Sequence, residues 1–410
     1  MNWITRAIRC GHRLASWLSC APCLIITLAL AAQAQTNDLR LRTFEKAWSI
    51  VNEKFWDGTF GGHDWGAIRD KYKPLVEAAK TDTEFYSIID KMLMELETSH
   101  MGIFTPEEIA QHKEVPTLVG FGFRELEGKF VITHVIPNSS AAEAGIKPGF
   151  VITKVDGVAT KTFVETQAKL QGEPNTKVTV AYLDARDIEH EVTLVRRPLA
   201  ADDRSKLGGM GFYGLFDQKR LEGGIGYFYF SNFLEFLNPR IKGAIESFAD
   251  APGIIIDLRG NSGGDDSVGL KMASYFFAKD TLLMITKTRK GDVKDYKTSP
   301  PKSPYLGKVV ILVDNFSMSA SEQFSAAMQD SGRAFVIGVK TTGLDMDGEI
   351  EGLPDGSALL YAHGLPRTVK GFIVEKNGIT PDKEVRLTRE GLLAGHDAQV
   401  DAAVKYVLGR

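Results

Sequence analysis

The first part of the chain carries apolar residues at the spacing of helices. Between Leu39 and Thr98 they recur three or four positions apart in three runs, which is the period of one buried helix face. The third helix is expected to end near Ser99 and His100. These helices predict an N-terminal helical domain over residues 35–114. The runs are Phe44, Trp48, Val51 and Phe55; Tyr72, Leu75 and Ala78; and Phe85, Ile88, Ile89, Met92, Leu93 and Leu96.

Between residues 115 and 198 the pattern changes to short β-type runs separated by glycine and asparagine. Such runs, bounded by turn-forming residues, predict strands. Two short helices are expected among them. The predicted strands cover 130–132, 151–155, 178–182 and 192–195, and the helices cover 140–145 and 162–170.

The remainder, residues 199–410, reads as alternating strands and helices. Continuous apolar runs such as 253–256 suit strands that are covered on both faces, as in an α/β sheet. The expected fold class is therefore multidomain α/β (α+β). The predicted strands cover 225–230, 254–258 and 309–313, and the predicted helices cover 241–248, 268–277 and 321–329.

Length and composition narrow the choice of protein class. A chain of 410 residues favours two or three domains. Hydrophobic residues make up 43% and charged residues 25%, so a disordered chain and a collagen-like fibre are both excluded. The net charge is −3 and no basic patch is indicated, which excludes nucleic acid as a partner.

The N-terminal residues resemble an export signal. Arg6, Arg9 and Arg13 precede an apolar stretch, and Ala32-Gln33-Ala34 offers the small-x-small pattern of a cleavage site. An apolar stretch of about ten residues is too short for a bilayer, which needs roughly 20, so no stable membrane anchor is expected. Residues 1–34 are therefore predicted to be removed, which places the mature protein outside the cytoplasm, in the periplasm or secreted. The signal holds all three cysteines, so a thiol nucleophile and a disulfide are not expected.

The segment 313–322 joins a β run to a helix through small hydroxyl residues. A serine at such a turn can project its oxygen at the edge of the sheet, where the helix N-terminus favours negative charge. Ser319 is the candidate nucleophile for acyl transfer. Ser319 and Glu322 also have the Ser-x-x-Glu spacing of a capping box, so a purely structural interpretation stays open at this point.

The segment 257–264, Asp-Leu-Arg-Gly-Asn-Ser-Gly-Gly, follows a predicted buried strand. Its glycine N–H groups lie at the end of the sheet where α/β sites form, and they could hold an oxyanion. A phosphate-binding loop is not supported because the Gly-Lys-Ser/Thr sequence is missing. An ordinary strand-to-helix turn is the alternative.

The β-type region resembles a PDZ domain, which implies that residues 115–198 fold as one. The resemblance rests on Gly-Phe-Gly-Phe at 120–123, the segment 136–146 and Val155-Asp156-Gly157, with Phe150 as a departure where the family has aspartate. PDZ domains bind a peptide C-terminus as an added strand, with the loop amides holding its carboxylate. The alternative is a spacer domain with a tight turn. The implied peptide-binding residues are Leu118, Gly120, Phe121, Gly122 and Phe123.

The order of motifs along the chain resembles the C-terminal processing (tail-specific) serine proteases and their relatives in the tricorn core. It rests on the 257–264 segment, on Ser-x-Ser-Ala-Ser-Glu at 317–322, and on Glu-Lys-Asn-Gly-Ile-Thr-Pro-Asp at 375–382. The resemblance implies an α/β core of the ClpP/crotonase-like type over 199–410 and a serine-type peptidase without a cofactor. It also implies that Ser319 is the nucleophile and that the oxyanion hole is formed by the amides of Ala320 and of Gly263 or Gly264.

The residue at the position of the catalytic base differs from the usual residue of that family. Most members carry a lysine in Thr-x-Gly-Lys-Gly, whereas this chain has Thr-Thr-Gly-Leu-Asp at 341–345. Leu344 stands at the lysine position and cannot accept a proton. Lys340, four residues earlier, is one alternative base.

The other candidate base is His100. Ser99-His100 resembles the tricorn-type branch, in which a serine and histidine of the helical domain serve the nucleophile and a glutamate, here Glu375, completes the set. Imidazole has an unperturbed pKa of about 6.5, which suits general-base catalysis near neutral pH. Taken alone, a histidine at such a place is more often a partner of a helix C-terminus or a partly buried polar residue than a catalyst. The other histidines lack metal-ligand spacing, so no metal site is expected.

Together these features predict an exported serine endopeptidase that recruits protein or peptide substrates by their C-terminal tails and uses a Ser–His mechanism. The alternative is a catalytically inactive peptide- or ligand-binding protein that keeps the fold. The oligomeric state stays open, with a homo-oligomer possible.

Overall fold

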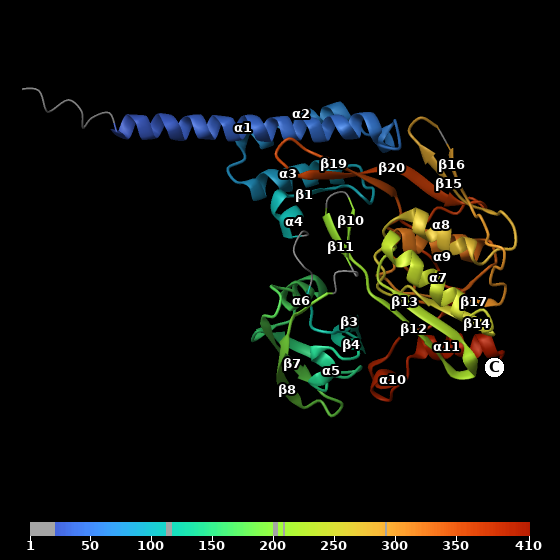
Figure 1. The fold of residues 1–410 in the computed structure, drawn as a ribbon. Helices are drawn as coiled ribbons and strands as arrows, with labels where there is room; N and C mark the ends of the chain where they lie inside the picture. The colour runs from blue at the N-terminus through green and yellow to red at the C-terminus, as the bar shows by residue number, and fades with distance from the viewer. Residues whose placement is uncertain (1–20, 112–116, 200–203, 208–209, 292) are drawn as a thin grey trace, which may run out of the picture.

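The computed structural model describes residues 21–111, 117–199, 204–207, 210–291 and 293–410. Residues 1–20 of the predicted export signal and the predicted boundary at 114/115 lie outside this part of the chain. The first helix, α1 (Ala21–Lys54), runs without a break past the predicted cleavage point after Ala34. Its N-terminal part projects from one end of the molecule, and its C-terminal part lies against the other N-terminal helices (Figure 1).

The N-terminal helices pack through one apolar cluster. α1 is followed by the short η1 (Phe60–Gly62), α2 (Trp65–Ala78) and α3 (Asp82–Met94). Phe44, Ile89 and Met92 are fully buried in the cluster, and each such side chain contributes about 1.5–3 kcal/mol relative to exposure. The expectation that the third helix ends near Ser99 and His100 was wrong, because α3 ends at Met94.

The helical region shares a sheet and an apolar core with the C-terminal part of the chain. β1 (Gly102–Phe104) pairs antiparallel with β20 (Ala358–Thr368), with Ile103 opposite Leu359. Tyr361 and Met346 belong to the same apolar cluster as the N-terminal helices. The sheet has the order β1-β20-β15-β16, with β19 also on β20. Its other strands, which were not predicted, are β15 (Leu282–Thr288), β16 (Val293–Lys297) and β19 (Asp347–Gly352).

A small β-rich unit follows α4 (Pro106–Gln111). Its main sheet has the order β3-β4-β5-β7-β8, and within the described residues β3 pairs only with β4, so one edge of β3 is open. The predicted strands and both predicted helices are present. The elements are β2 (Thr117–Leu118), β3 (Phe121–Leu126), β4 (Lys129–Val135), α5 (Ser140–Glu143), β5 (Val151–Val155), β6 (Val158–Ala159), α6 (Phe163–Leu170), β7 (Lys177–Leu183), β8 (Glu189–Val195) and β9 (Arg197–Pro198).

The α/β core is built on a six-stranded sheet of order β12-β13-β14-β17-β18-β21, parallel except for the β12–β13 pair. Alternate residues of the central strands face two apolar layers, Ile254 and Ile256 on one side and Ile255 on the other. This explains the continuous apolar runs in the sequence. The strands are β12 (Phe216–Arg220), β13 (Gly226–Phe230), β14 (Gly253–Asp257), β17 (Lys308–Val313), β18 (Phe335–Gly338) and β21 (Lys383–Glu384).

Helices cover both faces of this sheet. Residues of α7 (Asn238–Ser247), α8 (Asp266–Ser274) and α9 (Ala320–Asp330) share one apolar cluster with it, and α11 (Ala398–Leu408) covers the other face. β14 and β17 are parallel neighbours, so the loops after them meet at one edge, where sites of α/β sheets form. The remaining elements are β10 (Arg204–Leu207), β11 (Met210–Tyr213), η3 (Glu222–Gly224), η4 (Glu235–Leu237) and α10 (Arg389–Leu393).

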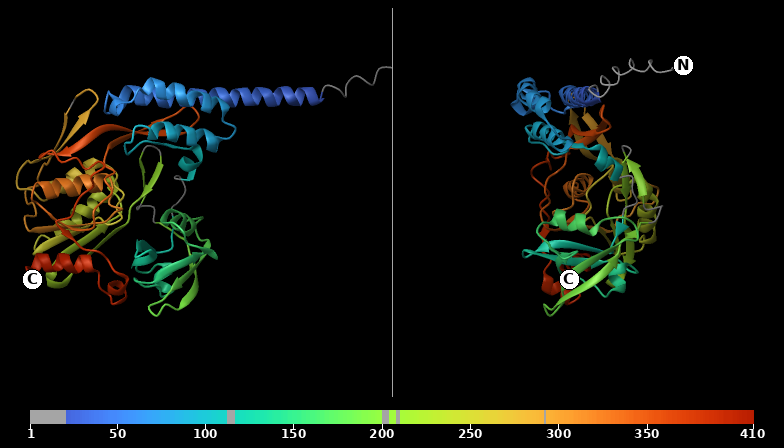
Figure 2. Two further views of the ribbon diagram at one scale, coloured as in Figure 1. Left: turned by 180° about the vertical axis from the view of Figure 1, so that it is seen from behind. Right: turned by 90° about the vertical axis from the view of Figure 1, so that its left-hand side faces the viewer.

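The short helix α10 joins the core to the β-rich unit, and the two views in Figure 2 show the two bodies side by side. Leu392 is buried against Val131 and Val151. Arg389 donates to the carbonyl oxygens of Gly149 at 3.0 Å and Asp184 at 2.8 Å. The orientation of the β-rich unit is therefore fixed by contacts as well as by its connections. None of the helices in the described ranges has both the length and the apolar character needed to cross a bilayer.

Candidate active site

Ser319 lies in a constrained turn between β17 and α9. Its backbone has φ 54° and ψ −124°, a conformation that non-glycine residues adopt rarely and that concentrates at functional sites. Close packing enforces the turn, because a Cβ at Gly263 would stand 2.7 Å from the Ser319 Cβ. The Ser319 N–H donates to the Leu344 carbonyl at 3.0 Å and to the Glu322 carboxylate at 3.3 Å. The Glu322 half of the predicted capping box is thus present beside the candidate nucleophile.

The Ser319 hydroxyl faces an imidazole from the N-terminal region. The Ser319 Oγ lies 3.1 Å from the His100 Nε2, and the His100 Nδ1 lies 2.9 Å from the Ser99 Oγ. The Ser99 hydroxyl donates to Glu375 Oε2 at 2.7 Å, and the Ser99 N–H donates to Glu375 Oε1 at 2.8 Å. The structure therefore brings together all four predicted residues from segments 219 and 276 positions apart in sequence.

The hydrogen-bond directions define the tautomer of His100. A carboxylate accepts only, so the single hydroxyl proton of Ser99 goes to Glu375, and the Ser99 oxygen must accept from the imidazole. The proton of neutral His100 is therefore on Nδ1, which leaves the Nε2 lone pair directed at the Ser319 hydroxyl. This is the arrangement that a general base requires.

His100 occupies a space that a glycine leaves free. It has a positive φ of 57° and lies two residues before β1. A Cβ at Gly348 on β19 would stand 3.0 Å from the His100 Cδ2. Burial lowers the pKa of His100, while the carboxylates of Glu375 and Asp347 act in the opposite direction. The lowered pKa keeps the imidazole neutral at pH 7, the form that can accept a proton.

The predicted oxyanion donors beside Ser319 differ in whether their N–H groups are already hydrogen-bonded. The Gly263 N–H donates to the Asn261 Oδ1 at 3.0 Å, which favours Gly264 over Gly263 as the glycine donor of the predicted oxyanion hole. The amides of Gly264 and Ala320 donate to no acceptor within the described ranges. Gly264 has φ 139°, and a Cβ there would stand 2.3 Å from the Phe233 oxygen, so only glycine fits. Ala320 is the first residue of α9, at its positive end.

Buried polar side chains join the two loops, and the sequence analysis did not identify them. The Ser321 hydroxyl donates to the Asn261 Oδ1 at 2.7 Å, and the Met318 N–H donates to the Asn261 carbonyl at 3.0 Å. The Ser317 hydroxyl donates to the Leu258 carbonyl at 2.7 Å. The available signal was the run of small hydroxyl residues at 317, 319 and 321, of which Ser317 and Ser321 donate to the loop after β14.

The lysine alternative finds no support in the contacts. Leu344 contributes its backbone to the site, and its side chain is 43% exposed. The Lys340 side chain is exposed, and within the described ranges no hydrogen bond or ion pair joins it to Ser319. The contacts of Ser319 therefore favour His100 over Lys340 as the base.

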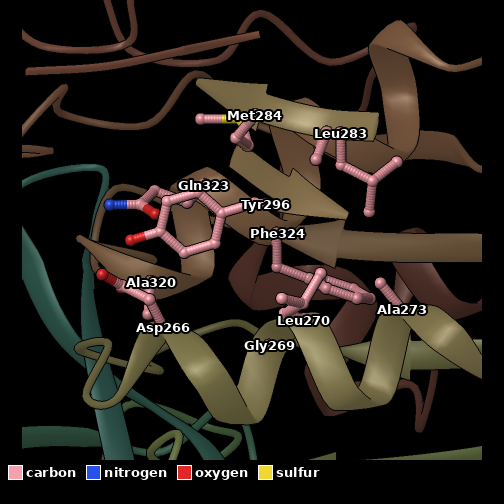
Figure 3. A pocket seen from close by; sticks show the side chains of 11 residues that line it. Asp266, Gly269, Leu270, Ala273, Leu283, Met284, Tyr296, Ala320, Gln323 and Phe324 are labelled. Atoms are coloured by element: carbon pink, nitrogen blue, oxygen red, sulfur yellow. The ribbon is translucent and has the colours of Figure 1, made fainter. Parts of the chain in front are cut away.

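A small apolar pocket opens beside Ala320. Its volume is about 30 Å³, and it lies between α8, α9 and strands β15 and β16. Figure 3 shows the Tyr296 hydroxyl and the Gln323 amide at the end near Ala320, with Phe324 and Leu283 at the other end. The pocket thus has polar groups at the end near Ala320 and apolar walls beyond them. The walls include Leu270, Ala273, Leu283, Phe324 and Ala327.

The predicted peptide-binding residues gather at the start of β3. Gly120 has φ 100°, and a Cβ there would stand 2.0 Å from the Ser139 Cβ, so the loop needs glycine. Gly122 is packed equally closely, against the His134 ring. Phe123 is buried, Phe121 is half-buried, and Leu118 pairs with Arg197 through β2 and β9. These residues lie beside the open edge of β3, where a peptide strand can be added.

The β-rich unit contacts the loop that leads to Ser319. Arg124 Nε pairs with the Asp314 carboxylate at 2.8 Å, and its guanidinium lies over the Phe316 ring at 4.9 Å. The Phe163 and Phe316 rings are 4.5 Å apart. Asp314 also accepts the Gly260 N–H at 2.9 Å, so this contact reaches both loops of the site. In the described ranges, no group of three or more His, Cys, Asp or Glu is placed to hold a metal.

Comparisons with known proteins match three parts of the chain. Residues 224–385 match the model of peptidase family S41, residues 40–94 match the tricorn protease C1 domain, and residues 131–183 match the PDZ domain. A carboxyl-terminal-processing protease of Synechocystis sp. is 28% identical over 385 residues, covering 89% of this chain and 86% of the relative.

Solved structures share the fold. A photosystem II D1 C-terminal processing protease has a TM-score of 0.58 and 23% identity, covering 88% of this chain and 98% of that one. The tricorn protease has a TM-score of 0.54 and 19% identity over 91% of this chain and 37% of that one.

The fold and the family matches define a serine peptidase with a PDZ domain and an α/β core. The chain is similar to peptidase family S41 over residues 224–385 and to carboxyl-terminal-processing proteases over most of its length, and residues 40–94 match the tricorn C1 domain. The predicted family and fold class are confirmed. The roles of the individual site residues stay predictions.

The space at Gly348 provides a test of the His100 position. In Gly348→Ala, the added methyl group displaces the imidazole from Ser319, and we expect kcat/KM for a peptide substrate to fall about 10-fold, since small misplacements of reacting groups are costly. Gly352→Ala is the matched control, because it lies on the same strand with open space at its Cβ. Equal rates in the two variants would contradict the assigned position of His100.

Proposed function

We propose that this chain is an exported serine endopeptidase in which Ser319 is the nucleophile and His100 is its general base. The observation that carries the proposal is the 3.1 Å contact between the Ser319 Oγ and the His100 Nε2, continued through Ser99 to Glu375. A nucleophile within hydrogen-bond reach of a base that is itself oriented by a third group is the signature of covalent catalysis by serine.

The reaction proceeds in two acyl-transfer steps. His100 Nε2 takes the Ser319 hydroxyl proton as Oγ attacks the scissile carbonyl carbon. The negative oxygen of the tetrahedral intermediate accepts from the amides of Gly264 and Ala320, at the positive end of α9. His100 then donates its proton to the leaving amine, and the C–N bond breaks. His100 then takes a proton from water as the water attacks the acyl-enzyme, the ester bond to Ser319 Oγ breaks, and His100 returns the proton to that oxygen.

Ser99 and Glu375 stabilise the charged form of the base. When His100 becomes an imidazolium, its Nδ1–H donates to the Ser99 oxygen, and the Ser99 hydroxyl transmits the interaction to the Glu375 carboxylate. Hydrogen bonds to a charged group contribute about 1.5–3 kcal/mol each. The pair therefore orients the ring and lowers the free energy of the intermediate.

In this proposal, the PDZ domain recruits the substrate. The open edge of β3 and the glycine loop at 120–123 suit a C-terminal tail that adds as a strand, with its carboxylate on the loop amides. Capture next to the core raises the local concentration of substrate at Ser319. The export signal proposed for residues 1–34 places this activity outside the cytoplasm, on protein or peptide substrates.

Replacing Ser319 with alanine tests the proposed nucleophile. Ser319→Ala is expected to lose hydrolysis of a peptide substrate and labelling by a serine-directed phosphonate, while its melting temperature and its binding of a C-terminal peptide remain those of wild type. Unchanged cleavage would end the assignment. A wild-type protein that binds tails, but neither cleaves nor labels, would instead be the inactive binding protein.

The pocket beside Ala320 is proposed to hold the substrate side chain that precedes the scissile bond. A volume of about 30 Å³ admits about two water-sized groups, which fits a small apolar side chain and excludes a ring.

Peptides that differ only at this position test the pocket. Alanine is expected to give a kcat/KM at least about 10-fold above phenylalanine, since even one methylene in such a pocket is worth about 1–3 kcal/mol. Leu283→Ala should reduce the difference, because it enlarges the apolar end. Equal rates for the two peptides would contradict the assignment.

A further inference from the structure

Glu322 is a buried carboxylate that accepts hydrogen bonds from the backbone of two separate segments. On the first turn of α9 and with no exposed surface, it accepts the N–H groups of Ser319 at 3.3 Å, Gly343 at 2.8 Å and Leu344 at 2.9 Å. It also accepts the Thr341 hydroxyl. Burial raises the pKa of Glu322, and the four donors oppose this shift. All four partners are donors, so the carboxylate form satisfies each of them.

The segment held by Glu322 is joined in turn to the one that carries Glu375. The Lys376 N–H donates to the Gly343 carbonyl at 2.8 Å, and the Ile379 N–H donates to the Thr341 hydroxyl at 2.8 Å. The Asp345 N–H donates directly to Glu375 Oε2 at 2.8 Å. Residues 341–345 therefore form a bridge between the nucleophile turn and the far end of the Ser–His–Ser–Glu series.

The contacts close into a ring. The ring runs from the Ser319 hydroxyl through His100, Ser99 and Glu375 to the Asp345 amide, and the neighbouring Leu344 carbonyl accepts the Ser319 N–H at 3.0 Å. A displacement of residues 343–345 therefore moves Glu375 and Ser319 relative to each other. Among the residues that the structure describes, Glu322 is the one whose side chain accepts hydrogen bonds from both the bridge and the nucleophile turn.

We propose that Glu322 is a positioning residue for the reaction: its carboxylate fixes residues 341–345 against the Ser319 turn and thereby sets the alignment of Ser319, His100 and Glu375. The proposal rests on the proposed function. It assigns to Glu322 a role beyond capping α9. It also gives a function to the backbone of Leu344, the residue at the position of the missing lysine.

The isosteric substitution Glu322→Gln separates this role from packing. An amide accepts through one oxygen only, and its NH₂ group would face donors, so at least one of the four partners loses its acceptor and the bridge shifts. We expect kcat for a peptide substrate to fall about 10-fold or more with KM within about threefold, since an interaction that aligns the reacting groups acts on the transition state. Phosphonate labelling of Ser319 should slow in parallel.

The pH profile provides a readout that a merely structural role would not move. The Glu375 carboxylate raises the pKa of His100, so loosening Glu375 lowers that pKa and shifts the acid limb of kcat/KM to lower pH. A smaller folded fraction would lower the plateau and leave the limb in place. Wild-type kcat, labelling rate and acid limb in folded Glu322→Gln would overturn the proposal.

A second pair of variants covers the case in which Glu322→Gln does not fold. Thr341→Val removes one donor to Glu322, and Thr342→Val, at the exposed neighbouring position, is its control. We expect a lower kcat and the same shift of the acid limb in Thr341→Val only, and equal behaviour of the pair would refute the role of Glu322. Loss of cleavage in Ser319→Ala tests the proposed function independently. Failure of the proposed function can therefore be distinguished from failure of the proposed role of Glu322.

Discussion

The site depends on the pairing of the three-residue strand β1 with β20. This pairing places His100, two residues before β1, above the turn that carries Ser319. The N-terminal helices and residues of β20 share one apolar cluster, so the imidazole is held by the burial of that whole cluster. Separation of the helical region from the sheet would remove the His100 imidazole and the Ser99 hydroxyl together. Folding of the two regions is thus coupled to assembly of the site.

The second constraint is the packing of backbone around the nucleophile. Gly263 and Gly264 allow the loop after β14 to approach Ser319, and Gly348 leaves room for the imidazole. Leu344 occupies the position at which most family members have lysine, and its carbonyl accepts the Ser319 N–H. The base that we propose in its place, His100, comes from another part of the chain. In our proposal, the backbone at this position helps to align Ser319.

Much of the fold was predictable because local patterns determine it. The apolar runs of β14 and β17 and the helical spacing in α3 were sufficient to predict those elements, and the order of motifs indicated the family. The sheet containing β15, β19 and β20 was not predicted, since its strands find their partners across long sequence separations. For the same reason, the motifs named Ser319, His100 and Glu375 separately but could not show that Asn261 engages the Gly263 amide or that Glu322 joins the segments.

The central claim is that an imidazole from the N-terminal region activates a hydroxyl of the α/β core. The most direct measurement is peptide hydrolysis by folded His100→Ala, with Lys340→Ala as the matched control. The account predicts that kcat/KM falls by about 10³-fold or more in His100→Ala, as expected for a base that acts with its nucleophile, and stays at the wild-type value in Lys340→Ala. Wild-type turnover by His100→Ala, or loss of turnover in Lys340→Ala alone, would contradict it.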